Sequence, residues 1–170
     1  MTERIYNVLF LCTGNSARSI LAEALMNRWG HGRFHAYSAG SHPTGTVNPY
    51  ALALLQKAGI ATEQARSKSW DEFAAPDAPQ MDFIFTVCDN AAGEACPYWP
   101  GHPMTAHWGV PDPAANKGTD VEKERAFRSA FRTLDARIKL FACLPLEKLE
   151  GLALRHQLTA IGKAGADTAA

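Results

Sequence analysis

Residues 8–19 read VLFLCTGNSARS, and this stretch predicts a buried strand, a short loop and the start of a helix. The apolar run at 8–11 is typical of a strand inside a parallel sheet, and apolar residues at helical spacing begin directly after the loop. Backbone N–H groups of such a loop can surround an anion, the helix adds its positive dipole end, and an arginine fork matches two oxygens of a phosphate-like ion. We therefore predict an oxyanion site at Thr13, Gly14, Asn15, Ser16, Ala17, Arg18 and Ser19.

Cys12, at the start of this loop, is the candidate nucleophile. The positive field of the loop is expected to lower the pKa of its thiol, and Ser19 can donate a hydrogen bond to the thiolate. The alternative is a buried cysteine at a strand end, because an isolated C-x5-R match often arises by chance. The strand before the loop, the helix after it and the serine next to Arg18 favour the functional interpretation.

The composition predicts one globular domain: the chain has 170 residues, of which 46% are hydrophobic and 20% charged. The formal net charge is zero, which gives no reason to expect nucleic acid or an anionic membrane as a partner. The sequence shows neither a signal-like apolar region nor a run long enough to span a membrane, so we expect a cytoplasmic protein. Its four cysteines are then more typical of catalytic, reduced or metal-binding thiols than of structural disulfides.

Strand-like and helix-like segments alternate along the chain. Strands are expected at 6–12, 34–39, 81–87 and 105–108, and helices at 20–29, 49–58, 69–75, 122–143 and 146–161. This order predicts an α/β fold of three layers, with a four-stranded parallel sheet and helices on both faces. Residues 1–145 are expected to form the catalytic domain, and 146–170 a helical extension with a frayed tail. Ligands of such sheets bind beyond the carboxyl ends of the strands, where Cys12 and Cys88 both stand.

Cys88 and Cys96 are joined by a link rich in alanine and glycine, which suits a transient disulfide better than a permanent one. One alternative is that Cys88 fills the core as a small hydrophobic residue. Another is a zinc site made by Cys88, Cys96, His102 and His107, although structural zinc usually takes its cysteines from a C-x2-4-C knuckle. Cys143, at the end of a helix lined with phenylalanines, is expected in the core.

Asp112 stands between two prolines, on a restricted backbone, after the segment His107-Trp108-Gly109. A carboxyl held so rigidly can serve as a general acid that protonates a leaving oxygen. The alternative is an aspartate that caps a helix start ahead of Pro113. The loop at 12–18 favours the acid, whereas His107 and Trp108 are expected to pack and form hydrogen bonds.

Together these residues resemble the low-molecular-weight protein-tyrosine phosphatases and, within that fold, the thiol-coupled arsenate reductases. The resemblance covers about residues 5–141 and is carried by 8–19, 37–40, 88–97, 107–109 and 112–114. Asn15, Cys88, the Cys-Pro pair at Cys96 and the His-Trp-Gly segment look like the reductase branch. Phosphatases of this fold tend to carry tyrosines beside the acid, where this chain has Ala114. The resemblance therefore implies an arsenate reductase, with a low-molecular-weight protein-tyrosine phosphatase as the alternative.

The resemblance also implies a thiol relay. Cys12 would attack arsenate or a similar oxyanion held by Arg18, while Asp112 protonates the departing oxygen. Cys88 would then attack the Cys12 sulfur as arsenite leaves. Cys96 would next attack the Cys88 sulfur, which frees Cys12 and forms a disulfide between Cys88 and Cys96. No bound cofactor is expected, only an external thiol reductant. The link between Cys88 and Cys96 is slightly longer than usual in this family, which leaves open thioredoxin or glutathione with glutaredoxin. An oxyanion sensor without enzymatic activity would need no general acid.

Some members of the reductase branch bind a structural potassium ion beside the loop that contains Asn15, with an acidic ligand from a later segment. Arg66-Ser67-Lys68 occupies the corresponding region of this chain. We therefore predict no metal site, with Lys68 supplying the positive charge.

Overall fold

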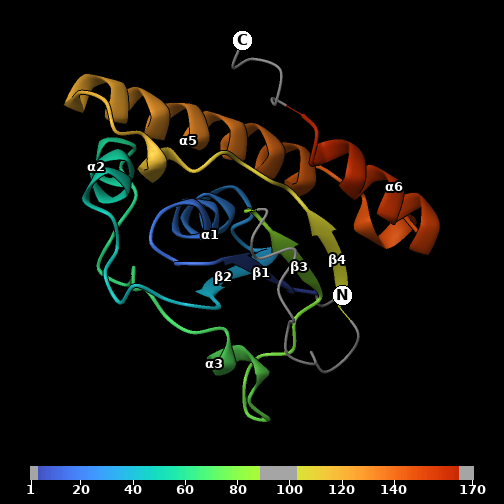
Figure 1. Cartoon of the computed structure of the whole chain (residues 1–170). Helices are drawn as coiled ribbons and strands as arrows, with labels where there is room; N and C mark the ends of the chain where they lie inside the picture. The colour runs from blue at the N-terminus through green and yellow to red at the C-terminus, as the bar shows by residue number, and fades with distance from the viewer. Residues whose placement is uncertain (1–3, 89–102, 165–170) are drawn as a thin grey trace.

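The computed structural model describes residues 4–88 and 103–164 (Figure 1). Its elements are β1 (Tyr6–Cys12), α1 (Arg18–Trp29), β2 (Phe34–Gly40), α2 (Pro49–Lys57), α3 (Asp71–Ala74), β3 (Phe83–Thr86), β4 (Met104–His107), η1 (Pro113–Ala115), α5 (Asp120–Ala142), η2 (Leu146–Lys148) and α6 (Gly151–Ile161). Over these residues, every helix is too short or too polar to span a membrane.

The four strands form one parallel sheet in the order β2-β1-β3-β4, which confirms the predicted fold class. Leu11 of β1 lies opposite Thr86 of β3, and Thr86 lies opposite His107 of β4. The carboxyl ends of these three strands are therefore level. The chain segments that leave them meet at one edge of the sheet, where ligands of such folds bind.

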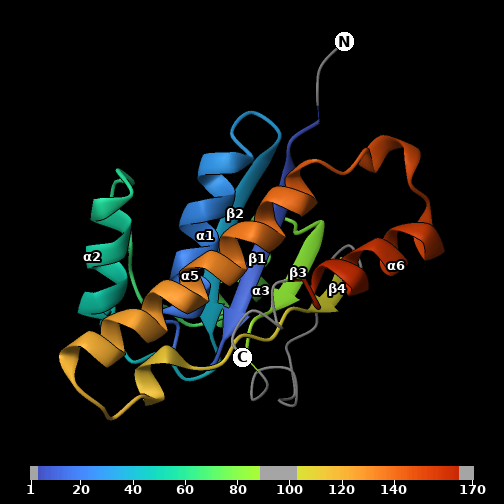
Figure 2. The ribbon, with the colours of Figure 1, turned by 90° about the horizontal axis from the view of Figure 1, so that it is seen from above.

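Helices cover both faces of the sheet, as Figures 1 and 2 show: α1, α2 and α5 lie on one side and the short α3 on the other. Alternate residues of β1 pack on opposite faces of the sheet, because successive side chains of a strand point to opposite sides. Phe10 belongs to the large core that contains Phe141 of α5, whereas Leu9 and Leu11 belong to a smaller core with Phe73 of α3. The central strand is thus buried on both faces, which explains its continuous apolar run.

Two expectations for the C-terminal part are wrong in detail. Cys143 is exposed rather than buried, because it follows the buried Phe141 by two positions and so faces away from the core. The helix expected over 146–161 is divided: η2 comes first, Leu149 and Glu150 are extended, and α6 starts at Gly151. Leu158 of α6 is fully buried, so this second part packs onto the rest of the fold.

Candidate active site

The loop between β1 and α1 turns its carbonyl groups outward. The carbonyl oxygens of Thr13, Gly14 and Ser16 accept hydrogen bonds of 2.8–3.0 Å from backbone N–H groups of the segment 42–48. In a trans peptide the C=O and the next N–H point in opposite directions, so the N–H groups that follow face the inside of the loop. Helix α1 begins there without a side-chain cap or an acidic residue in its first turn. This geometry suits the predicted oxyanion site.

Asn15 and Gly40 allow the loop its tight shape. Asn15 has a positive φ of 45°, a left-handed conformation that asparagine tolerates better than most residues. Its buried side chain donates to Ser19 Oγ at 2.8 Å and accepts from the Lys68 backbone N–H at 2.9 Å. A Cβ on Gly40, at the end of β2, would overlap the Thr13 carbonyl oxygen. Only glycine therefore fits where the loop crosses β2.

The structure brings Cys12 and Cys88 together at the carboxyl ends of β1 and β3. Both side chains are buried, and they form a hydrogen bond with each other. The Cys88 sulfur also accepts a hydrogen bond from the Thr13 backbone N–H at 3.3 Å and lies 3.5 Å from Thr13 Oγ1. A second thiol thus touches the candidate nucleophile at the mouth of the oxyanion loop.

The loop groups act on the pKa of Cys12 in the predicted direction, but the expected net lowering is wrong, because the pKa is raised in this arrangement. The hydrogen bond with Cys88 raises the pKa of Cys12, and so does burial, while Arg18 and the Thr13 N–H lower it. Two adjacent thiols resist carrying two negative charges, so they lose their protons in two separate steps whose pKa values belong to the pair. The Ser19 hydroxyl oxygen accepts from Asn15. The hydrogen bond that the Ser19 hydroxyl is expected to donate to a Cys12 thiolate stays a prediction.

Arg18 and Asp112 face each other across the mouth of the loop. Arg18 Nη1 donates to the Val110 carbonyl oxygen at 2.9 Å, and its Nη2 lies 3.7 Å from Asp112 Oδ2. The other carboxylate oxygen of Asp112 accepts from the Ala114 N–H at 3.0 Å, so this residue also caps the short helix η1. The side chain of Asp112 is 44% exposed and that of Arg18 13%. The carboxyl group is accordingly open to an incoming ligand.

A buried ion pair lies behind the loop. Lys68 Nζ is 3.8 Å from the carboxylate of Glu23 and donates to Ser38 Oγ at 3.2 Å and to the Arg66 carbonyl oxygen at 3.0 Å. Burial lowers the pKa of Lys68 and raises the pKa of Glu23, and in each case the opposite charge of the partner counteracts it. The backbone N–H of Lys68 donates to Asn15, whereas its ammonium group faces Glu23 and Ser38.

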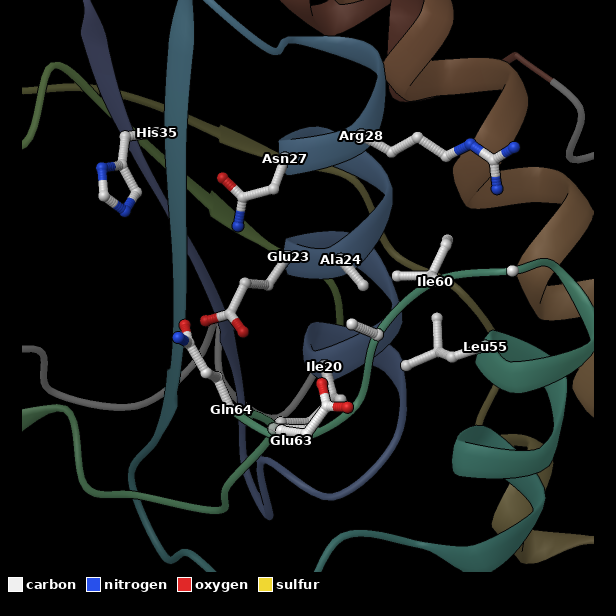
Figure 3. Close-up of a pocket in the computed structure, with 13 residues that line it drawn as sticks. Ile20, Glu23, Ala24, Asn27, Arg28, His35, Leu55, Ile60, Glu63 and Gln64 are labelled. Atoms are coloured by element: carbon white, nitrogen blue, oxygen red, sulfur yellow. The ribbon is translucent and has the colours of Figure 1, made fainter.

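A groove of about 750 Å³ runs along the flank of α1 (Figure 3). Glu23 and Asn27 of α1, His35 of β2 and most of the segment 59–65 line it. The loop residues 12–18 are not among the residues that line it. The groove is thus a separate site from the one that contains the two thiols.

Two predicted residues, Cys96 and His102, lie outside the described part of the chain. His107, another member of the alternative zinc set, has its Nδ1 atom 2.7 Å from Thr86 Oγ1. Across residues 4–88 and 103–164, no three His, Cys, Asp or Glu side chains form a group that could hold a metal ion.

The sequence interpretation overlooked Glu23 and Arg137. Arg137 is almost fully buried and donates three hydrogen bonds to backbone carbonyl oxygens. Its signal is present in the sequence, because it lies on the same helical face as Leu134 and Phe141. A cation among apolar positions indicates a buried guanidinium that needs acceptors.

Residues 7–151 match the family described as low molecular weight phosphotyrosine protein phosphatase, and the chain belongs to this family. An arsenate reductase of Halalkalibacterium halodurans is 38% identical over 135 residues, which cover 79% of this chain and 94% of that protein. The arsenate reductase of Bacillus subtilis is 36% identical with the same coverage. The solved arsenate reductase of Archaeoglobus fulgidus superposes with a TM-score of 0.63 at 27% identity, covering 79% of this chain and 98% of that one.

Proposed function

We propose that this protein is an arsenate reductase that converts arsenate to arsenite through Cys12, Cys88 and Cys96. The contact between Cys12 and Cys88 carries the proposal. Hydrolysis of a phosphoester needs a nucleophile, an arginine and an acid, but no second thiol against the nucleophile. The similarity to proteins named arsenate reductase supports the same choice.

In the first step, Arg18 Nη2 turns from Asp112, and the guanidinium holds two oxygens of arsenate while Nη1 keeps its bond to the Val110 carbonyl through its second N–H. The Cys12 thiolate attacks arsenic and forms a sulfur–arsenic bond. Asp112 donates a proton to the departing oxygen, which leaves as water. The raised pKa of Cys12 makes formation of its thiolate part of this step, with Arg18 favouring it.

In the second step, the Cys88 thiolate attacks the Cys12 sulfur. The disulfide forms as the sulfur–arsenic bond breaks, and its electron pair stays on arsenic, which is reduced from the pentavalent to the trivalent state. The Thr13 N–H, at 3.3 Å from the Cys88 sulfur, favours the required thiolate. Arsenite is then the leaving group.

Cys96 completes the relay by attacking the Cys88 sulfur, which releases Cys12 as a thiolate and leaves a disulfide between Cys88 and Cys96. An external dithiol supplies the two electrons that reduce it: thioredoxin, or glutathione with glutaredoxin. Because the relay needs a reducing compartment, the proposal places the reaction in the cytoplasm.

The test compares arsenate-dependent NADPH consumption with thioredoxin and with glutathione plus glutaredoxin, for the wild type and its cysteine variants. Cys12→Ser should lose all activity, because a serine hydroxyl has no comparable anion at neutral pH. Cys88→Ser should lose repeated arsenate reduction yet still cleave an activated aryl phosphate. Cys96→Ser should yield one arsenite per enzyme with thioredoxin and then stall.

Cys143→Ser is the matched control, because this thiol is exposed and lies at the C-terminal end of α5, and it should behave as the wild type. Repeated arsenate reduction by Cys88→Ser with thioredoxin would overturn the relay. Aryl phosphate cleavage by the wild type without any arsenate reduction would instead assign the chain to the phosphatases.

A further inference from the structure

The segment that carries Asp112 is attached to the C-terminal helix. Trp108, four residues before the acid, is fully buried, and its ring stacks on Phe85 of β3 at 3.9 Å between centroids. Its indole Nε1–H donates a buried hydrogen bond of 3.0 Å to the carbonyl oxygen of Leu158 in α6. Figure 2 shows α6 beside β4, the strand from which this segment continues.

Gly162, at the end of α6, lies directly against the same segment. A Cβ atom at this position would be 2.8 Å from the His107 carbonyl oxygen and 2.8 Å from Trp108 Cδ1. Real Cβ atoms essentially never approach other heavy atoms so closely. The end of α6 and the backbone at 107–108 therefore touch without room for any side chain.

Arg137 of α5 ties the two segments together from a third side. Its Nη1 atom donates to the carbonyl oxygens of Trp108 and Gly109, each at 3.0 Å. Its Nε atom donates to the carbonyl oxygen of Ala164, three residues after α6, at 2.9 Å. One buried guanidinium thus bonds the segment that leads to the acid and the chain that leaves α6.

This attachment continues into the candidate active site over a short and stiff path. The Val110 N–H donates to the Val87 carbonyl oxygen at 3.0 Å, next to Cys88, and the Val110 carbonyl accepts from Arg18. Prolines on either side of Asp112 restrict the backbone that remains. A displacement at Trp108 is therefore transmitted to the acid rather than absorbed.

The attached helix lies beyond the part of the chain that defines the family. The family match ends at residue 151, where α6 begins. The 135 residues aligned with the Halalkalibacterium halodurans protein already cover 94% of that protein.

We propose that α6 and the residues up to Ala164 are a positioning clamp for the general acid, which acts through Trp108 and Arg137 to set the place of Asp112 over the oxyanion loop. The clamp rests on the proposed function only in that Asp112 is the acid, a role that cleavage of aryl phosphates by the same site would also use. Trp108, Arg137 and Gly162 are positioning residues, because none of them reaches the oxyanion loop.

The test compares Gly162→Ala with Gly151→Ala, a matched change at the other end of α6 where a Cβ meets nothing within 4 Å. Three quantities are measured for each variant and for the wild type. They are phosphate affinity by calorimetry, the rate of a single arsenate turnover, and the ratio of cleavage rates for 4-nitrophenyl phosphate and phenyl phosphate. The poor leaving group, phenol, needs the acid, whereas nitrophenolate hardly does.

Gly162→Ala should slow arsenate turnover about tenfold to a hundredfold, as expected when a catalytic group is displaced by about 1 Å. It should raise the rate ratio in favour of the nitrophenyl ester and leave phosphate affinity within about twofold of the wild type, since the loop itself is unchanged. The same change should add little in an Asp112→Asn background, because the acid is then already lost. Gly151→Ala should match the wild type in all three measurements.

Trp108→Phe is the second variant, because it keeps an aromatic ring on Phe85 and removes the indole N–H that bonds Leu158. It should shift the rate ratio in the same direction, and it replaces Gly162→Ala in the test if that variant does not fold. An unchanged ratio in a folded Gly162→Ala or Trp108→Phe enzyme overturns the clamp, as does an equal slowing of both esters. Failure of the wild type to reduce arsenate overturns the proposed function instead. The ratio of cleavage rates for the two aryl esters then still tests the clamp.

Discussion

Replacing Lys68 with methionine removes the cation from a buried ion pair while keeping most of the length of the side chain. The Lys68 side chain is 6% exposed and that of Glu23 19%, so the carboxylate that remains is poorly solvated. Removing one partner of a buried pair typically costs 3–5 kcal/mol, because the other charge is left uncompensated. Glu23 also has hydrogen bonds with Ser38. These place the expected loss near the lower limit, at about 3 kcal/mol.

The loss should depend on pH with a definite sign. Burial already raises the pKa of Glu23, and Lys68 opposes that rise, so Lys68→Met raises the pKa further. A group with a raised folded-state pKa contributes stability below its unfolded pKa, and that stability is lost as the pH rises through the folded value. The variant should therefore be least stable relative to the wild type near neutral pH. The difference should shrink as the pH falls towards the ordinary range of a glutamate.

Denaturant unfolding at several pH values measures this difference, and calorimetry should give a melting temperature lower by roughly 6–12 °C near pH 7.5. The exposed Lys57→Met is the matched control and should stay within about 0.5 kcal/mol of the wild type. The double variant Glu23→Gln with Lys68→Met should recover much of the loss, since no charge remains buried. If Lys68→Met is as stable as Lys57→Met at neutral pH, the pair does not stabilise the fold and the reasoning is refuted.

Three further predictions concern the catalytic groups. Arg18→Lys keeps the charge but loses the bidentate fork, so phosphate affinity measured by calorimetry should fall about tenfold or more; wild-type affinity would contradict the role of Arg18. Asp112→Asn should slow adduct formation at Cys12 by about 10²–10⁴-fold in single-turnover experiments, while thiol exchange between Cys88 and Cys96 hardly changes. Cys88→Ala removes the hydrogen bond that raises the pKa of Cys12, so alkylation of Cys12 by iodoacetamide, mapped by mass spectrometry, should reach half its maximum at lower pH. An unchanged or higher midpoint would show that burial alone controls this thiol.

Local patterns predicted most of the fold. The run at 8–11 is apolar without interruption, as expected for a strand buried on both faces, and β1 occupies the predicted residues 6–12. Helix α1 ends before Gly30, as its apolar spacing predicts. The predicted strand at 81–87 is longer than β3, whose pairing covers only Phe83–Thr86. Strand ends depend on partners far away in the sequence, so local pattern locates them less accurately than it locates the strand.

The electrostatics of the site could not be predicted in the same way. The pKa of Cys12 is dominated by Cys88, which is 76 positions away in the sequence and meets it only because β1 and β3 are neighbours. The pair of Glu23 and Lys68 likewise joins α1 to a segment 45 positions later. Sequence reasoning found Lys68 and its place beside Asn15, but not the carboxylate that compensates it. Such pKa shifts depend on burial and on contacts between distant residues, and local sequence patterns contain neither.

Arg18 connects the two halves of the proposed reaction. In the structure Nη1 donates to the Val110 carbonyl and Nη2 is directed to Asp112, so Nη2 must change partners before the guanidinium can hold an oxyanion. That exchange turns the guanidinium away from Asp112 and leaves the exposed carboxyl facing the bound oxyanion. The oxyanion is itself negatively charged and opposes ionisation of Cys12, so Arg18 and the inward N–H groups must compensate it. We infer that a lysine at position 18, with one point of contact, would hold the oxyanion less rigidly between Cys12 and Asp112 even where it still binds.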